Sequence, residues 1–69
     1  MISFERFFDS LRFDEISTYK LIKEYRISSS TINRLKNNKP VSTATIEKLC
    51  KILNYDLYDI MEFKSDEQN

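Results

Sequence analysis

The sequence predicts an all-α protein, a compact five-helix bundle that occupies residues 1–63. Three observations lead to this fold class. Apolar residues recur at the spacing of an amphipathic helix in several segments. Serines stand immediately before these segments, where a hydroxyl can accept hydrogen bonds from the free amides of a first turn. No segment shows the two-residue alternation of a strand, although residues 62–63 could extend along a partner.

The first helix is expected from Ser3, as its N-cap, to about Arg12. An apolar stripe at helical spacing defines it, made of Phe4, Phe7, Phe8 and Leu11. An aromatic stripe of this kind is more often core than a ligand site, so we assign it to the core. Phe13 and Ile16 are expected to close over the end of this helix.

Two short helices follow, each preceded by a serine. Ser17 is the predicted N-cap of residues 18–24, and Ser28 is the predicted N-cap of residues 29–36. The intervening segment 25–27 has the length of the turn that sets two helices at a steep angle. Residues 17–37 therefore form a candidate helix-turn-helix unit, a device for recognising a DNA groove.

The last third of the chain is expected to complete the bundle. A fourth helix begins after Ser42 and is limited upstream by Pro40, and its apolar face consists of Ile46, Leu49, Cys50 and Leu53. Asp56 is the predicted cap of a short fifth helix with three inward residues, Leu57, Ile60 and Met61. Residues 64–69 lack apolar side chains and are predicted to be a disordered acidic tail.

The charges of the chain are unevenly distributed although they cancel overall. Eleven Lys and Arg oppose eleven Asp and Glu, so the formal net charge is zero. Residues 17–41 nevertheless carry six Lys and Arg against one Glu, a net charge of +5, while the segments 1–16 and 42–69 carry −2 and −3. A basic cluster of this size can be a solvated helix face. Together with the two caps and the turn, it indicates a nucleic-acid-binding unit.

The chain resembles the Cro/C1-type (XRE-like) helix-turn-helix regulators, as a small stand-alone member. The resemblance extends from about residue 3 to 63, includes the segments 41–54 and 59–63, and rests on cap and core positions: Ser17, Leu21, Ile27, Ser28, Thr31, Ile32 and Leu35. It implies a lambda repressor-like DNA-binding domain that acts as a transcriptional regulator, in particular a repressor. Its partner would be double-stranded DNA.

Two positions depart from the family pattern. The family usually has glycine in the turn, where this chain has Arg26. If this residue adopts a positive φ, its side chain destabilises the fold by about 1 kcal/mol. The family also tends to have alanine at the position of Ile22, where the two helices approach closely, so a larger side chain can shift their crossing.

The second helix of the unit, about Ser29 to Asn37, is the expected recognition helix. The resemblance places Ser29, Ser30 and Arg34 at positions that commonly contact base edges in the major groove, with Asn33 as an additional candidate. An arginine can bind guanine through two hydrogen bonds, asparagine suits adenine, and serine discriminates little. As a surface residue, Arg34 can instead be paired with solvent.

Candidate phosphate contacts lie at the ends of the two helices. Thr18 and Ser28 stand at helix starts, where hydroxyls and free amides favour an anion. Four residues that follow the recognition helix are expected to hold the DNA backbone: Lys36, Asn37, Asn38 and Lys39. Other roles are open for several of these residues, because Ser28 can be a cap alone, residues 37–38 a turn alone, and Lys39 a solvated lysine.

A homodimer is expected, because one module of this size buries too little surface for strong selectivity and operators usually consist of paired half-sites. Four apolar residues remain outside the inward stripes near the C-terminal end: Ile52, Tyr55, Tyr58 and Phe63. They can form a two-fold contact or thicken a thin core, and the sequence favours neither.

Other classes of protein fit the sequence less well. The chain has no histidine and no glycine-rich phosphate loop, so an enzyme is not expected, and neither a metal, a cofactor nor a small-molecule ligand is indicated. A lone Cys50, no membrane-spanning segment and no secretory signal favour the cytoplasm. The main alternative is a protein-interaction module on the same fold, such as an antitoxin or anti-repressor.

Overall fold

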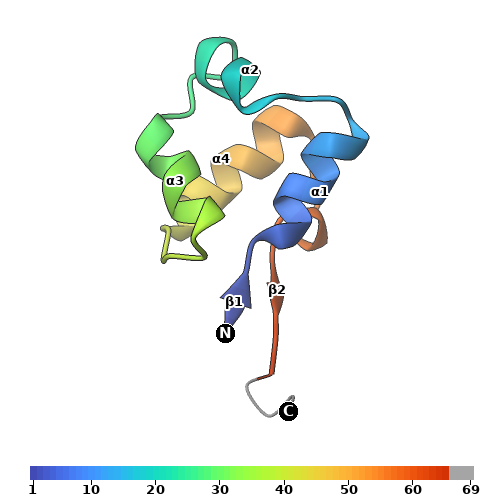
Figure 1. Ribbon diagram of the computed structural model, residues 1–69, viewed down its shortest axis with the longest axis vertical. Helices are drawn as coiled ribbons and strands as arrows, with labels where there is room; N and C mark the ends of the chain where they lie inside the picture. Colours follow the sequence, from blue (N-terminus) through green and yellow to red (C-terminus); the bar gives the residue numbers. More distant parts are fainter. Residues whose placement is uncertain (66–69) are drawn as a thin grey trace.

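The computed structural model describes residues 1–65 and contains four α-helices, one 3-10 turn and a two-stranded ribbon (Figure 1). The helices are α1 (Glu5–Phe13), α2 (Thr18–Lys23), α3 (Ser29–Lys36) and α4 (Thr43–Leu53). The 3-10 turn η1 is Leu57–Asp59, and the strands are β1 (Ile2–Ser3) and β2 (Glu62–Phe63). Helix α4 lies in the middle of the molecule between α3 on one side and α1 on the other (Figure 1).

The first helix begins one residue later than predicted, because Ser3 belongs to strand β1 and Phe4 takes the N-cap position. Phe4 occupies the N-cap position without a side-chain cap, and its amide donates to Asn38 Oδ1 at 2.8 Å. The hydroxyl of Ser3 still accepts a hydrogen bond from the amide of Glu5 at 3.2 Å. The prediction of Ser3 as the N-cap was therefore wrong. Ser3 lies one position before the actual N-cap, and from there its hydroxyl still satisfies an amide of the first turn.

The end of α1 is closed by one of the two residues predicted to close it. Ile16 packs against the core, and its amide donates to the carbonyl of Leu11 at 2.8 Å. Phe13, in contrast, is 89% exposed. The prediction for Phe13 was wrong because the helical turn places this last residue of α1 on the solvent side.

The three serine caps predicted for the following helices are confirmed. Ser17, Ser28 and Ser42 each adopt extended backbone angles, and each side chain accepts a hydrogen bond from the amide three residues later at 3.0–3.1 Å. This geometry satisfies an amide of the first turn that has no partner within the helix. The start of each of these helices is therefore encoded locally.

The predicted fifth helix is a single 3-10 turn, so the bundle has four α-helices within residues 1–65. Asp56 caps η1 as predicted, and Asp59 completes a reciprocal capping box. The turn is held on α1 by Ser10 Oγ, which donates to the carbonyl of Asp59 at 2.9 Å. Ile60 is fully buried, but Leu57, which was predicted to point inward, is 51% exposed because one short turn buries few positions.

The two short strands join the two ends of the described chain. Ile2 pairs with Phe63 and Ser3 with Glu62 in an antiparallel ribbon. Residues 62–63 thus extend along the N-terminus of their own chain, whereas the sequence suggested a partner. Lys64, the first residue of the predicted tail, donates its amide to the carbonyl of Met1 at 2.8 Å and its ammonium to Glu5 at 2.9 Å. The rest of that tail, from residue 66, lies outside the described residues.

The core is a single apolar cluster to which every helix contributes. It consists of residues from the predicted stripes on α1 and α4, the predicted core positions of the helix-turn-helix unit, and Ile60 after η1: Phe4, Phe7, Leu11, Leu21, Ile27, Ile32, Leu35, Ile46, Leu49 and Ile60. This cluster fixes α2 and α3 on the rest of the bundle, so the helix-turn-helix unit is held by buried contacts. No helix within residues 1–65 has the length and apolar character to cross a membrane.

Candidate nucleic-acid interface

The turn between α2 and α3 holds the two helices in a fixed relation. The amide of Ile27 donates to the carbonyl of Leu21 at 3.0 Å, and both side chains are buried in the core. Between them, Arg26 adopts a left-handed conformation with φ of 61°. Arg26 therefore has the positive φ considered in the sequence analysis. A backbone position that favours glycine carries a long side chain here.

Ile22, the second position that departs from the family pattern, is not part of the buried core. Its side chain is 40% exposed on α2. Its neighbour Leu21 is fully buried in the core. An isoleucine at this position is accommodated because part of the side chain remains in solvent.

Helix α3 has one buried side and one polar side. Ile32 and Leu35 are 4% and 1% exposed and face the core. The four predicted base contacts, Ser29, Ser30, Asn33 and Arg34, are all exposed. Because successive helical residues are 100° apart, Ser30, Asn33 and Arg34 lie on the side opposite Ile32 and Leu35, and Ser29 lies at its edge. The structure brings these four side chains onto one accessible surface.

The C-terminal end of α3 is closed by its own polar side chains. Asn37 is the C-cap, and its side-chain amide donates to the carbonyl oxygen of Asn33 at 2.8 Å and to Asn33 Oδ1 at 3.2 Å. Arg34 Nη1 donates to the carbonyl of Pro40 at 3.4 Å, a long hydrogen bond at the surface. Asn33 and Arg34 are thus oriented by weak, exposed contacts that a ligand can replace.

The predicted phosphate contacts occupy several different environments. Ser28 and Lys36 are exposed at the two ends of α3, and Thr18 is half-buried at the start of α2. The hydroxyl of Ser28 also serves as the N-cap, since it accepts from the amide of Thr31 at 3.1 Å. A cap role and a phosphate contact are compatible, because the neighbouring amides of a helix start still point outward.

Asn38 and Lys39 lie beyond the helix, in the connection to α4. Asn38 has a φ of 54°, and its Oδ1 atom accepts the hydrogen bond from the amide of Phe4. This bond between residues 34 positions apart ties the end of the helix-turn-helix unit to the start of α1. This structural role is not visible in the sequence, because an asparagine after a helix indicates a C-terminal turn but not a distant partner.

The basic side chains of the unit are available to a ligand. Among residues 1–65, ion pairs join Arg12 to Asp9, Lys51 to Glu47 and Lys64 to Glu5. None of these pairs includes a Lys or Arg of residues 17–41. The net charge of +5 in that segment is therefore not neutralised by the acidic ends of the part of the chain that the structure describes.

One further basic feature of α2 was not assigned from the sequence. Lys23 places its ammonium 5.9 Å from the centre of the Tyr19 ring, and Tyr19 is 68% exposed. The two residues are four positions apart, which puts them on the same face of the helix. This spacing could have identified the pair, a cation and an aromatic ring on the first helix of the helix-turn-helix unit.

The four apolar residues that lie outside the predicted inward stripes separate into two groups. Ile52 and Tyr55 are half-buried against the core, whereas Tyr58 and Phe63 are 75% and 72% exposed. The hydroxyl of Tyr55 donates to Asp14 Oδ2 at 2.7 Å, and burial together with this hydrogen bond raises the pKa of Tyr55 above its ordinary value. Ile52 and Tyr55 thicken the core, and Tyr58 and Phe63 remain available for a contact.

The described residues contain no group of three or more His, Cys, Asp or Glu side chains that could hold a metal ion. What they do contain is a capped helix pair with a polar outer side and unpaired cations.

This arrangement is that of a helix-turn-helix DNA-binding domain. A family model of the Cro/C1-type HTH DNA-binding domain matches residues 11–66, most of the 69-residue chain, and the protein belongs to this family. No curated protein and no solved structure matches the chain significantly.

Proposed function

We propose that this protein is a sequence-specific regulator of transcription that binds double-stranded DNA through the major groove, with α3 as the recognition helix. The observation that carries the proposal is the exposed polar side of α3, which presents Ser29, Ser30, Asn33 and Arg34 together. An eight-residue helix is about 12 Å long, and the major groove, about 12 Å wide, admits it.

In this proposal the base edges are contacted from the middle of α3. Arg34 donates two hydrogen bonds to guanine after releasing its long bond to Pro40, and Asn33 is suited to adenine. Ser29 and Ser30 contribute hydrogen bonds with little discrimination. Specificity therefore depends mainly on Arg34, for which one good bidentate contact is worth about 1–3 kcal/mol of discrimination.

The phosphate contacts of the proposal flank the recognition helix. Thr18 and Ser28 bring helix starts to the backbone, and Lys36 and Asn37 follow α3 as it leaves the groove. We leave out Asn38, whose side-chain oxygen is bonded to Phe4, and Lys39, which lies at the edge of a separate cavity. The surplus positive charge of residues 17–41 supports this assignment.

We further propose that the protein acts in the cytoplasm as a homodimeric repressor. Two copies of α3 related by a two-fold axis would contact half-sites about 34 Å apart. A protein bound across a promoter occupies the DNA that RNA polymerase needs, and it requires no contact with the polymerase itself. Repression is therefore the simplest outcome of binding.

The test is selection of bound sequences from a random double-stranded DNA pool by the full chain at low salt, with the Arg34→Ala variant as the matched control. A regulator enriches a recurring motif in paired half-sites, and the variant loses preference at one position of each half-site. Retention of all sequences alike, or of none together with stable co-purification of a protein partner, would contradict the proposal and favour the interaction module.

A further inference from the structure

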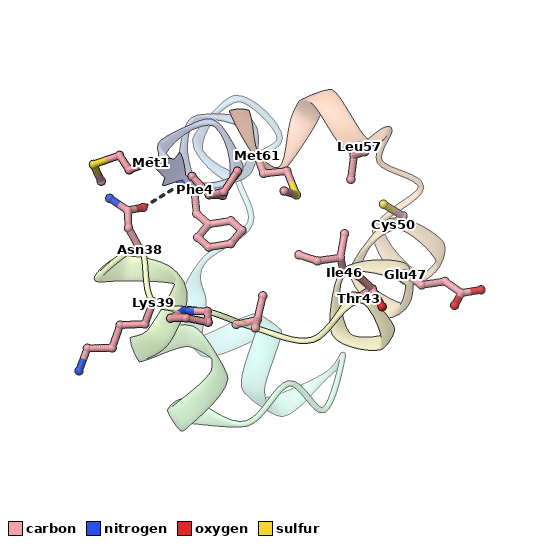
Figure 2. Close-up of a pocket in the computed structure, with 13 residues that line it drawn as sticks. Met1, Phe4, Asn38, Lys39, Thr43, Ile46, Glu47, Cys50, Leu57 and Met61 are labelled. Atoms are coloured by element: carbon pink, nitrogen blue, oxygen red, sulfur yellow. Dashed lines mark hydrogen bonds between the residues drawn. The ribbon is translucent and has the colours of Figure 1, made fainter. Parts of the chain in front are cut away.

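A cavity of about 760 Å³ lies between the N-terminal strand, the α3–α4 connection, α4 and η1 (Figure 2). Its walls are almost entirely apolar and are formed by Phe4, Val41, Ile46, Cys50, Leu57 and Met61. The hollow is open to solvent, so its apolar walls lack the cover that most apolar surface gains on folding. An apolar hollow of this size in a 69-residue chain therefore indicates a surface that another group covers.

Exposed apolar side chains border the cavity on the side of the ribbon. Met1, Ile2 and Leu57 line it and are 53%, 39% and 51% exposed. Phe63 is paired directly with Ile2, and directly paired residues of an antiparallel ribbon project to the same face. The 72% exposed ring of Phe63 therefore lies on the same face of the ribbon as Ile2. A monomeric protein rarely exposes apolar residues in such a continuous group.

The flanks of the cavity carry opposite charges. Lys39 and Glu47 line opposite sides of it, and their side chains extend outward (Figure 2). A two-fold axis through this face exchanges the two sides, so Lys39 of one copy meets the partner's Glu47, and the reverse pair forms at the same time. Glu47 already forms an exposed ion pair with Lys51 on α4 at 3.1 Å, and its two carboxylate oxygens can accept from a second cation as well. The face is thus complementary in charge to a second copy of itself.

We infer that this face, composed of the cavity, its border and the β1–β2 ribbon, is the interface between two copies of the chain. The inference rests on the homodimer of the proposed function and names its surface. The hollow requires a convex counterpart, which the ribbon supplies because it extends from the helical body and carries Phe63 (Figure 1). Helix α2 lies at the opposite end of the molecule from the ribbon, away from this face (Figure 1).

The first test compares two exposed phenylalanines by sedimentation of the full chain without DNA. Phe63→Glu places a charge in the inferred interface and is expected to weaken self-association at least about tenfold. Phe13→Glu makes the same change on α1, at a residue that is 89% exposed and does not line the cavity, and self-association is expected to stay unchanged. Equal effects of the two substitutions would overturn the inference.

The second test exchanges charges across the interface. Lys39→Glu and Glu47→Lys are each expected to weaken self-association about tenfold, because each creates two pairs of like charges in the dimer. A mixture of the two variants restores both attractive pairs and is expected to form heterodimers, detected by native mass spectrometry. Lys48→Glu, on α4 but outside the cavity lining, is the control that leaves the dimer intact.

Three results would overturn the inference: a strictly monomeric wild-type chain at high concentration, single charge variants that associate as the wild type does, or a monomer that carries a small apolar molecule in native mass spectra. All of these measurements omit DNA. The inference can therefore fail while selection from the DNA pool succeeds, and failure of DNA selection leaves the dimer result standing.

Discussion

Within residues 1–65 of this glycine-free chain, four residues adopt a positive φ, and they differ in how readily they tolerate this conformation. Asn38 and Asn54 accept the left-handed conformation readily, whereas Glu15 and Arg26 do not. Asn38 directly follows the C-cap of α3, and Asn54 is the C-cap of α4. In both cases the next amide donates to a carbonyl five residues back. The turn of the helix-turn-helix unit is therefore built on a locally strained Arg26.

Replacement of Arg26 by glycine is expected to increase the free energy of unfolding by about 0.5–1 kcal/mol. Glycine removes a left-handed penalty of roughly 1–2 kcal/mol, and part of the gain is offset by its greater freedom in the unfolded chain. Urea denaturation measures the change. Arg26→Ala is the matched control, because it removes the same charge but retains the steric penalty. Equal stability of the two variants would show that charge, not backbone strain, is responsible.

The raised pKa of Tyr55 predicts that the free energy of unfolding depends on pH in the alkaline range. Its pKa is raised above the ordinary value of 10.0, first by burial and then by the hydrogen bond to Asp14. The folded state therefore retains the phenolic proton more tightly than the unfolded chain. This contribution to stability is fully present below pH 10 and is lost as the pH rises above it.

The Tyr55→Phe variant is expected to lose less stability than the wild type between pH 8 and pH 11, as measured by denaturant unfolding at each pH. At pH 8 the same variant should be less stable by about 0.5–1.5 kcal/mol, the usual worth of a hydrogen bond. Tyr58→Phe, at a 75% exposed tyrosine, serves as the control. A wild-type pH dependence retained in Tyr55→Phe would rule out this residue as its source.

At the level of the elements, the local and the tertiary contributions to α3 can be separated. Ser28 determines where the helix begins, and its hydroxyl bond to the amide of Thr31 forms within one turn. Burial of Ile32 and Leu35 determines which side faces outward. The polar side of α3 is thus exposed because the core holds the opposite side.

Substitution Arg34→Ala tests α3 as the recognition helix. Because Arg34 is exposed and its hydrogen bond to Pro40 is long, the fold should be unchanged by circular dichroism and thermal unfolding. Discrimination at one base pair of each half-site should fall by about 1–3 kcal/mol, measured by binding titrations with single-base operator variants. Binding that weakens equally for all sequences would assign Arg34 to a phosphate instead.

On the scale of the whole molecule, the three acidic residues that form ion pairs within residues 1–65 pair with cations outside the basic segment. Asp9 pairs within α1, Glu47 pairs within α4, and Glu5 pairs with Lys64 of the ribbon end. The cations of residues 17–41 remain without ion pairs in the described part of the chain. A zero net charge is therefore compatible with a positive DNA-binding surface.

The Lys36→Ala variant is expected to weaken binding to all DNA sequences and to reduce the slope of log K against log salt by about 0.9, the value for one phosphate contact. Fluorescence anisotropy titrations at salt concentrations from about 50 to 200 mM measure the slope. Lys48→Ala, on α4 outside the basic segment, should leave it unchanged. An unaltered slope in Lys36→Ala would mean that this lysine faces solvent in the complex.

Local signals in the sequence were sufficient for the four helices, the serine caps of α2, α3 and α4, and the buried faces. Each depends on interactions within a turn or on a 3.6-residue apolar period, both of which are visible along the chain. The same signals failed for Ser3, Phe13 and Leu57. These residues lie at element ends, where the ribbon and the shortness of η1 decide what is buried.

The sequence by itself determined that this chain forms capped helices with a basic helix-turn-helix segment, because capping, periodicity and charge act over a few residues. The tertiary structure alone decided that residues 62–63 pair with the N-terminus, that Asn38 holds the start of α1, and that an apolar cavity opens beside α4. These features join segments more than 30 residues apart. Contacts at that separation depend on how the helices pack against one another, which local spacing does not reveal.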